Sequence, residues 1–170
     1  MARSAGGDGL LFTTVRSPIG VLRLVGDERS LHGVTIDGQR WSTACDPLWR
    51  RAEQPFALAS RQLEEYFAGD RTRFELPVRL AGTPFQVSVW RALGQIEFAS
   101  TRSYGQVAAS VGRPRAARAV GFANARNPLA IVLPCHRVVG ADGRLVGYGG
   151  GLERKAWLLE HEASVLERAA

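Results

Sequence analysis

The chain has 170 residues, of which 45% are hydrophobic and 22% are charged, and it carries a net charge of +6. These values are ordinary for a globular protein of one domain or two small ones. Two cysteines are too few for a disulfide framework, no apolar run is long enough to span a membrane, and residues 1–9 lack the apolar core of a secretory signal. We therefore expect a cytoplasmic protein with a free Cys135, although a bridge to Cys45 stays open.

The first eighty residues predict a small domain of sheet and helix, 10–80, after a disordered tail, 1–9. The turn-forming sequence Ser17-Pro18-Ile19-Gly20 lies between two β-forming runs and predicts a hairpin. Residues 39–55, which include Trp41, predict irregular structure. The regular elements expected here are strands at 10–16, 21–25, 31–36 and 72–80, and a helix at 56–67 that stops at Gly69.

Residues 81–165 predict a second, mainly helical domain, which gives an α/β (α+β) fold class. Thr83 before Pro84 is typical of a helix N-cap and first turn, and Ser103 is a second candidate N-cap. Two short helices joined at Gly112 have the pattern of a helix-turn-helix. The helices expected are 85–96, 103–111, 114–125 and 153–162.

A basic stretch overlaps this helix pair, because no acidic residue occurs between Phe98 and Ala141. The second helix carries small residues on its surface, which let a helix backbone approach a partner closely. The arginines can neutralise phosphates. The alternative is that the small residues pack against another helix and the arginines are solvated. The residues concerned are Ala116, Ala117, Ala119, Gly121, Arg102, Arg113, Arg115, Arg118, Arg126 and Arg137.

Cys135 is the strongest candidate for chemistry. The apolar run 131–133 predicts a strand that ends at Pro134, which has no N–H to donate. A cysteine acts as a nucleophile in its thiolate form, so it needs a base or a positive neighbour, and His136 and Arg137 are adjacent. The alternative is that Cys135 is a small buried hydrophobe, since neighbours in an extended segment point to opposite faces.

The wider segment resembles the active site of the O6-alkylguanine-DNA alkyltransferases (methylated-DNA–protein-cysteine methyltransferases). The hallmark of that family is Pro-Cys-His-Arg-Val, preceded by Asn-Pro and followed by Gly-Tyr-x-Gly-Gly. The chain has all three parts in order, at 134–138, 127–128 and 147–151. The resemblance covers 83–162 and extends more weakly over 10–80. It implies an RNase H-like first domain, a helix-turn-helix second domain and repair of double-stranded DNA without a cofactor.

The resemblance also implies roles for individual residues. Cys135 would accept the alkyl group irreversibly, so each molecule would react once, on O6-alkylguanine and on O4-methylthymine. His136 would take the thiol proton through a water, Glu162 at the end of the last helix would orient His136, and Asn127 would be the hinge between the recognition helix and the active-site turn. The expected form is a monomer, associated with the nucleoid in a prokaryote, and whether it assembles cooperatively on DNA stays open.

The base to be repaired would be flipped from the minor groove into a pocket. By resemblance, Arg118 is the arginine finger that fills the base stack, and Tyr104 assists rotation of the 3′ phosphate. The carbonyls of Cys135 and Val138 would accept from the guanine amino group. Tyr148 would line the alkyl side of the pocket, and the Gly149 N–H would lie near O6.

Two departures from the family pattern concern the pocket and a loop. Position 149 is usually Ser, so Gly149 predicts a wider pocket. Residues 97–101 read Glu-Phe-Ala-Ser-Thr where relatives have Pro-Tyr-Gly-Glu-Thr. Some relatives bind zinc in the first domain, but here Cys45 and His32 are the only soft ligands before residue 80, so we expect no metal.

Three rival functions fit the residues less well. A lesion-binding relative without activity would carry another residue, usually tryptophan, in place of Cys135. A cysteine hydrolase would need an oxyanion hole and turnover on esters or amides. A transcription factor that senses alkylation would need an added module, for which 170 residues leave little room.

Overall fold

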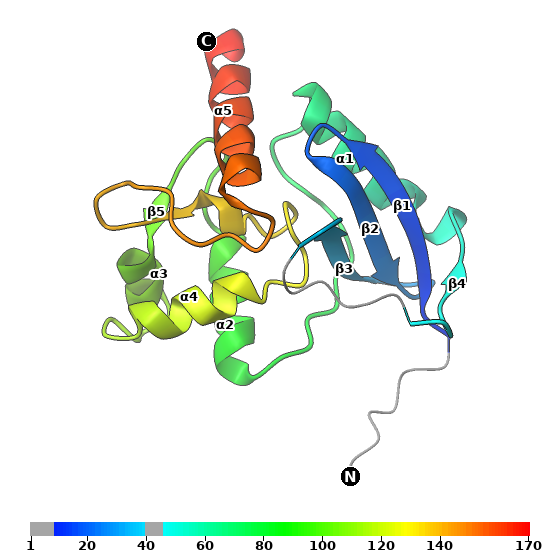
Figure 1. The fold of residues 1–170 in the computed structure, drawn as a ribbon, viewed down its shortest axis with the longest axis horizontal. Helices are drawn as coiled ribbons and strands as arrows, with labels where there is room; N and C mark the ends of the chain where they lie inside the picture. Colours follow the sequence, from blue (N-terminus) through cyan, green and yellow to red (C-terminus); the bar gives the residue numbers. More distant parts are fainter. Residues whose placement is uncertain (1–8, 40–45) are drawn as a thin grey trace.

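The computed structural model describes residues 9–39 and 46–170. The expectations for most of the tail and for Trp41 and Cys45 therefore lie outside the described residues. The chain forms a sheet domain and a helical domain side by side, as Figure 1 shows. This confirms the predicted mixed α/β fold class. Within the described ranges, no helix has the length and apolar character needed to cross a membrane.

The first domain is built on a sheet with the strand order β3-β2-β1-β4. Strands β1 (Leu11–Ser17) and β2 (Gly20–Gly26) pair antiparallel, with Ser17 opposite Gly20, which confirms the predicted hairpin. Strand β3 (Leu31–Ile36) pairs antiparallel with β2, and the short β4 (Arg50–Arg51) lies parallel to β1. The outer edge of β3 is left to pair with other segments.

Helix α1 (Ala57–Ala68) packs on this sheet after the 3-10 turn η1 (Gln54–Phe56). It ends as predicted at Gly69, whose φ of 86° suits a residue without a side chain. The predicted strand at 72–80 is wrong. Only Val78 bridges to Leu31, because Pro77 has no N–H to continue a ladder.

The second domain begins at α2 (Pro84–Leu93). Thr83 and Ser103 cap α2 and α3 (Tyr104–Ser110) with capping boxes, so both predicted N-caps are confirmed. After α4 (Ala117–Ala125), the chain forms the 3-10 turn η2 (Cys135–Arg137). Its remaining elements are β5 (Arg102–Ser103), β6 (Val138–Val139), which pairs with β5, and α5 (Leu152–Ala169).

The predicted boundaries need four corrections, of which the first is that helix α2 ends at Leu93 rather than at Ile96. Helix α4 begins three residues after Pro114, since the turn from Gly112 (φ 72°) continues through Ala116. The predicted strand at 131–133 is instead a tight turn in which Ile131 has a φ of 72°. Helix α5 continues to Ala169, so Glu162 lies in its middle rather than at its end.

The turn at 129–138 joins two hydrophobic cores. Leu129 and Ile131 belong to the core under the sheet and α1, with Leu158 of α5. Cys135 and Val138 belong to the core formed by α2, α3 and α4. The start of the turn also pairs with the free edge of β3, where the Val34 N–H donates to the Pro128 carbonyl at 2.8 Å.

Candidate active site

The backbone turn before η2 fixes Cys135 at the centre of the molecule. Its N–H donates to the Leu133 carbonyl at 2.7 Å, and its side chain is 5% exposed. Asn127 fastens the same turn: Nδ2 donates to the Leu133 carbonyl at 2.7 Å and Oδ1 accepts from the Leu129 N–H at 3.0 Å. The structure therefore places Asn127, the predicted hinge, between the end of α4 and the turn that carries Cys135.

His136 and Glu162 form a fully buried pair. His136 Nε2 lies 2.7 Å from Glu162 Oε1, and both side chains are 0% exposed. A carboxylate only accepts, so Nε2 carries the proton and Nδ1 is the acceptor. Burial lowers the pKa of His136, and the carboxylate of Glu162 only partly offsets that effect. The imidazole is therefore neutral at pH 7 and able to take a proton.

The Glu162 carboxylate is held by donors from three parts of the chain: η2, α1 and the loop that contains Ala99. Arg137 donates from Nη2 to Oε1 at 2.9 Å and from Nε to Oε2 at 2.9 Å. The Ala99 N–H donates to Oε2 at 3.0 Å, and the Tyr66 hydroxyl donates to Oε1 at 2.8 Å. Burial opposes the charge of Glu162, but the hydrogen bonds and charges of His136 and Arg137 outweigh it and hold the pKa at about 2.

Arg137 thus forms its ion pair with Glu162 and not with the Cys135 thiol. Its Nη1 also donates to the Ile96 carbonyl at 2.6 Å. Arg137 was a candidate positive neighbour of Cys135 and a member of the basic stretch. The structure corrects both interpretations, because the guanidinium is buried against the carboxylate and not presented at the surface.

The Cys135 thiol is protonated at neutral pH. Burial raises its pKa, while the Asn127 amide and the charge of Lys155 offset part of the rise. Three buried polar atoms of residues around it have no partner among the described residues: Asn124 Oδ1, His136 Nδ1 and the Tyr148 hydroxyl. Unpaired buried groups are costly, so these atoms are candidates to bind polar groups from outside the protein.

Lys155 is a site residue that the sequence analysis missed. It is fully buried on α5, and its Nζ donates to the carbonyls of Val138 at 2.5 Å, Val146 at 2.9 Å and Gly147 at 3.4 Å. Burial lowers its pKa to about 8. Lys155 therefore connects the strand after Cys135 to the loop that carries Tyr148. The signal in the sequence is a lysine on the apolar face of the last helix.

A cavity of about 440 Å³ opens between α4 and this loop. Tyr104, Tyr148 and Gly149 line it, and both tyrosine rings pack against the core that contains Cys135. The Tyr104 hydroxyl donates to the Val146 carbonyl at 3.0 Å, which ties α3 to the loop. The cavity is therefore bounded by three of the four residues expected to form the base pocket, while Val138 lies buried behind it.

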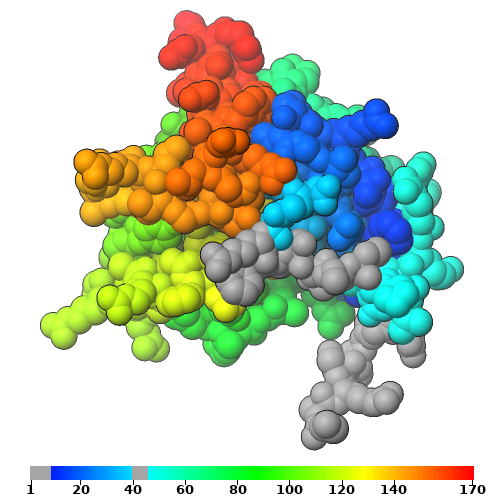
Figure 2. Space-filling model, viewed as in Figure 1, coloured from blue at the N-terminus to red at the C-terminus, as the bar shows by residue number. Residues whose placement is uncertain are grey.

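The rim of the cavity on α4 carries exposed arginine and apolar side chains. Arg118, Gly121 and Phe122 line the cavity, and the Arg126 guanidinium lies 5.9 Å from the centre of the Phe122 ring. Arg113 and Ala119 are exposed, and Ala116 and Ala117 are partly exposed. In Figure 2, the yellow-green α4 lies below the orange loop that follows residue 140, on the same side of the molecule. Of the predicted DNA-binding residues, Arg118 and Gly121 thus border the cavity.

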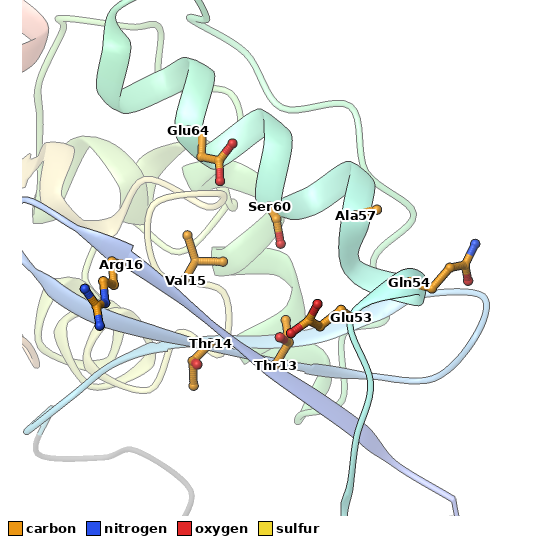
Figure 3. Close-up of a pocket in the computed structure, with 9 residues that line it drawn as sticks. All are labelled: Thr13, Thr14, Val15, Arg16, Glu53, Gln54, Ala57, Ser60 and Glu64. Carbon is orange, nitrogen blue, oxygen red and sulfur yellow. The ribbon is translucent and has the colours of Figure 1, made fainter.

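A second cavity, of about 630 Å³, lies between β1 and α1 (Figure 3). Hydroxyl and carboxylate side chains line it, among them Thr13, Ser60 and Glu64, and none of the predicted site residues reaches it. In the described ranges no three His, Cys, Asp or Glu side chains gather as metal ligands, and His32 contacts Asp27 at 3.0 Å.

Comparisons with known proteins cover nearly the whole chain. Residues 10–80 match the family model of the 6-O-methylguanine DNA methyltransferase ribonuclease-like domain, and residues 84–164 match that of the DNA-binding domain. A methylated-DNA–protein-cysteine methyltransferase of Methanosarcina acetivorans is 46% identical over 155 residues, or 91% of this chain and 99% of the relative. One of Mycobacterium leprae is 51% identical over 146 residues, or 86% and 88%.

The fold agrees with these sequence matches. A crystal structure of Mycobacterium tuberculosis OGT in complex with DNA superimposes with a TM-score of 0.86 at 47% identity, covering 91% of this chain and 94% of that one. A methyltransferase structure from the archaeon Pyrococcus kodakaraensis superimposes with a TM-score of 0.59 at 26% identity, covering 90% and 98%. The chain therefore belongs to the 6-O-methylguanine DNA methyltransferase family.

Proposed function

We propose that this protein repairs DNA by moving the alkyl group of O6-alkylguanine to Cys135 in a single irreversible step. The observation that carries the proposal is the buried His136–Glu162 pair directly after the buried Cys135, next to a cavity rimmed by arginines. A neutral imidazole with a free Nδ1 suits removal of a proton from a thiol whose pKa is raised.

The reaction is a displacement at the alkyl carbon. The Cys135 sulfur forms a bond to that carbon as the bond to O6 breaks, and the electron pair leaves with the guanine oxygen. The thiol proton passes through a water to His136 Nδ1 and then to the departing guanine, so the products are S-alkylcysteine and guanine. A thioether is not hydrolysed under these conditions, and each molecule therefore reacts once.

The target base reaches the cavity by rotating out of the duplex. Arg118 on α4 and Tyr104 on α3 stand on the cavity wall, where one occupies the emptied base stack and the other guides the rotating phosphate. The exposed small residues of α4 let the backbone approach the minor groove. The same chemistry extends to O4-methylthymine, which also presents an O-bonded methyl group beside a ring nitrogen.

The test is intact-mass analysis after mixing with duplex DNA that carries one O6-methylguanine. We expect one added methyl group on Cys135, unmodified guanine in the DNA, and no second turnover with excess substrate. Cys135→Ser is the control, which binds the DNA and gains no mass. An unchanged mass in the wild type with retained binding would identify a lesion binder, and continued turnover on an ester would identify a hydrolase.

A further inference from the structure

Tyr66 brings the first domain into direct contact with the proton-transfer groups of the second. Its hydroxyl donates to Glu162 Oε1 at 2.8 Å across 96 residues of sequence, and both side chains are fully buried. Burial and the Glu162 charge raise the pKa of Tyr66 well above its ordinary value, so it stays a donor.

Tyr66 and His136 share one oxygen atom. His136 Nε2 lies 2.7 Å from the same Oε1 that accepts from Tyr66, while Oε2 accepts from the Ala99 N–H. Arg137 contacts both oxygens. A carboxylate offers about four lone-pair positions, so these donors occupy the whole group. A stronger bond from any one of them reduces the negative charge available to the others.

The position of Tyr66 is fixed from several sides. His161, next to Glu162 on α5, donates from Nε2 to the Tyr66 carbonyl at 2.8 Å. The ring packs edge-on against Phe98 with centroids 6.2 Å apart, and Phe98 lies 5.5 Å under the Arg137 guanidinium. The hydroxyl therefore meets Oε1 in one geometry, set by α1, α5 and the loop that contains Ala99.

We propose that Tyr66 is a positioning residue that holds Glu162 Oε1 in place and draws charge from it, which keeps His136 a weaker base. Without the hydroxyl, Oε1 is more negative, the imidazolium of His136 is better stabilised, and His136 is protonated at a higher pH. The titratable and charged groups that face this pair are Glu162 and Lys155 of α5, Cys135 and Arg137 of η2, and Tyr148 of the loop between β6 and α5. His161 lies on the far side of Tyr66.

The decisive measurement is the NMR titration of His136 in the DNA-free protein, compared between wild type and Tyr66→Phe. We expect the His136 midpoint to rise by roughly half a unit to one unit in the variant, as follows from loss of one hydrogen bond to the charged partner. In a plot of the methyl-transfer rate against pH, the fall in rate at acid pH should move upward in pH by the same amount. An identical His136 midpoint in both proteins would overturn the proposal.

Two further variants separate positioning from structural support. His161→Phe removes the bond to the Tyr66 carbonyl but leaves the hydroxyl, so it should lower stability without moving the His136 midpoint. Tyr66→3-fluorotyrosine keeps the fold and donates more strongly, so it should lower the midpoint, and no shift would again overturn the proposal. The inference rests on the proposed function for its meaning, but the titration needs no substrate, so absence of alkyl transfer would count only against that function.

Discussion

Lys155 and Glu162 occupy the same buried face of α5, two helical turns apart, and each binds a different half of the site. Lys155 donates to the carbonyls of Val138 and Val146, while Glu162 accepts from His136. One helix therefore aligns the loop that carries Tyr148 with His136, the proton acceptor. Substitutions on this face should separate the contribution of Lys155 to the pocket from that of Glu162 to proton transfer.

Lys155→Met should lower both the stability of the pocket and the reactivity of the Cys135 thiol. The Val138 and Val146 carbonyls would lose their donor inside the protein, and each such loss costs about 1–3 kcal/mol. The thiol would also lose a nearby positive charge, so alkyl transfer should slow by roughly tenfold or more, since a pKa shift of one unit changes the thiolate fraction tenfold. Urea unfolding and transfer rates check this. Arg144→Met, which removes an exposed cation from the same loop, should change neither.

Glu162→Gln should destabilise the protein and nearly abolish transfer. It leaves Arg137 buried without a counter-charge, for which the typical cost is about 3–5 kcal/mol. Glu160→Gln on the exposed side of α5 is the matched control and should change neither the stability nor the transfer rate. In the double variant with Arg137→Met, stability should largely return while the rate stays low. Recovery of the rate as well would show that Glu162 acts only as a structural ion-pair partner.

Acid should unfold the wild type by protonating Glu162. Its pKa is about 2 in the folded protein against an ordinary value of 4.5, so this contribution is present above 4.5 and is lost as the pH falls toward 2. The difference corresponds to about 3 kcal/mol, from about 1.4 kcal/mol per pKa unit. Stability measured between pH 5 and pH 2 should therefore fall more steeply in the wild type than in Glu162→Gln, and parallel curves would contradict the assignment.

The rate of transfer should be almost independent of pH across the neutral range. Burial lowers the pKa of His136 from 6.5 and raises that of Cys135 from 9.0, so a neutral histidine faces a protonated thiol throughout this interval. A thiolate that reacted without His136 would instead give a rate that rises about tenfold per pH unit. Single-turnover rates from pH 6 to pH 9 distinguish a plateau from that slope.

Ala99→Gly should stabilise the protein. Ala99 has a φ of 56°, which costs an L-residue about 1–2 kcal/mol, and it stands where the family pattern has glycine. The greater conformational freedom of glycine in the unfolded chain reduces this gain in stability by about 0.4–1 kcal/mol. Ala109→Gly, at an exposed position one residue before the end of α3, should have the opposite sign, with a loss of up to about 1 kcal/mol. Thermal unfolding of the two variants checks the contrast.

Gly149→Ser should narrow the pocket and discriminate against large alkyl groups. A Cβ at position 149 would lie 3.3 Å from the Gln39 side chain, so the loop or Gln39 must shift. We expect O6-benzylguanine to inactivate the wild type, and the variant to lose more rate with benzyl than with methyl. Repeating the comparison in a Gln39→Ala background, which relieves the contact, should restore part of the loss.

Local sequence chemistry predicted the parts of the fold that depend on neighbours in the chain. The hairpin at Ser17–Gly20 and the caps at Thr83 and Ser103 are such cases. The strand expected at 131–133 failed because Ile131 takes a left-handed conformation that its type disfavours, and the turn is held by Asn127. Hydrophobicity alone does not distinguish a buried turn from a buried strand.

Contacts between segments that are distant in the sequence could not be predicted from it. Tyr66 has the pattern of an ordinary core residue on α1, and nothing near it in sequence indicates Glu162. Lys155 gave a readable signal, because it lies on the apolar face with Leu158 and Val165, where a charge needs a partner. The motif around Cys135 identified the nucleophile, but only the folded chain shows which groups surround it.

The pairing of Val34 with the Pro128–Ala130 backbone gives the first domain an unexpected part in repair. The hallmark motif lies entirely in the second half of the chain, yet an isolated second half would leave these backbone groups without partners and would expose Leu129, Ile131 and Leu158 to water. The sheet therefore works as a scaffold for the reactive turn, and its edge strand belongs to the catalytic machinery as much as the helix that faces DNA.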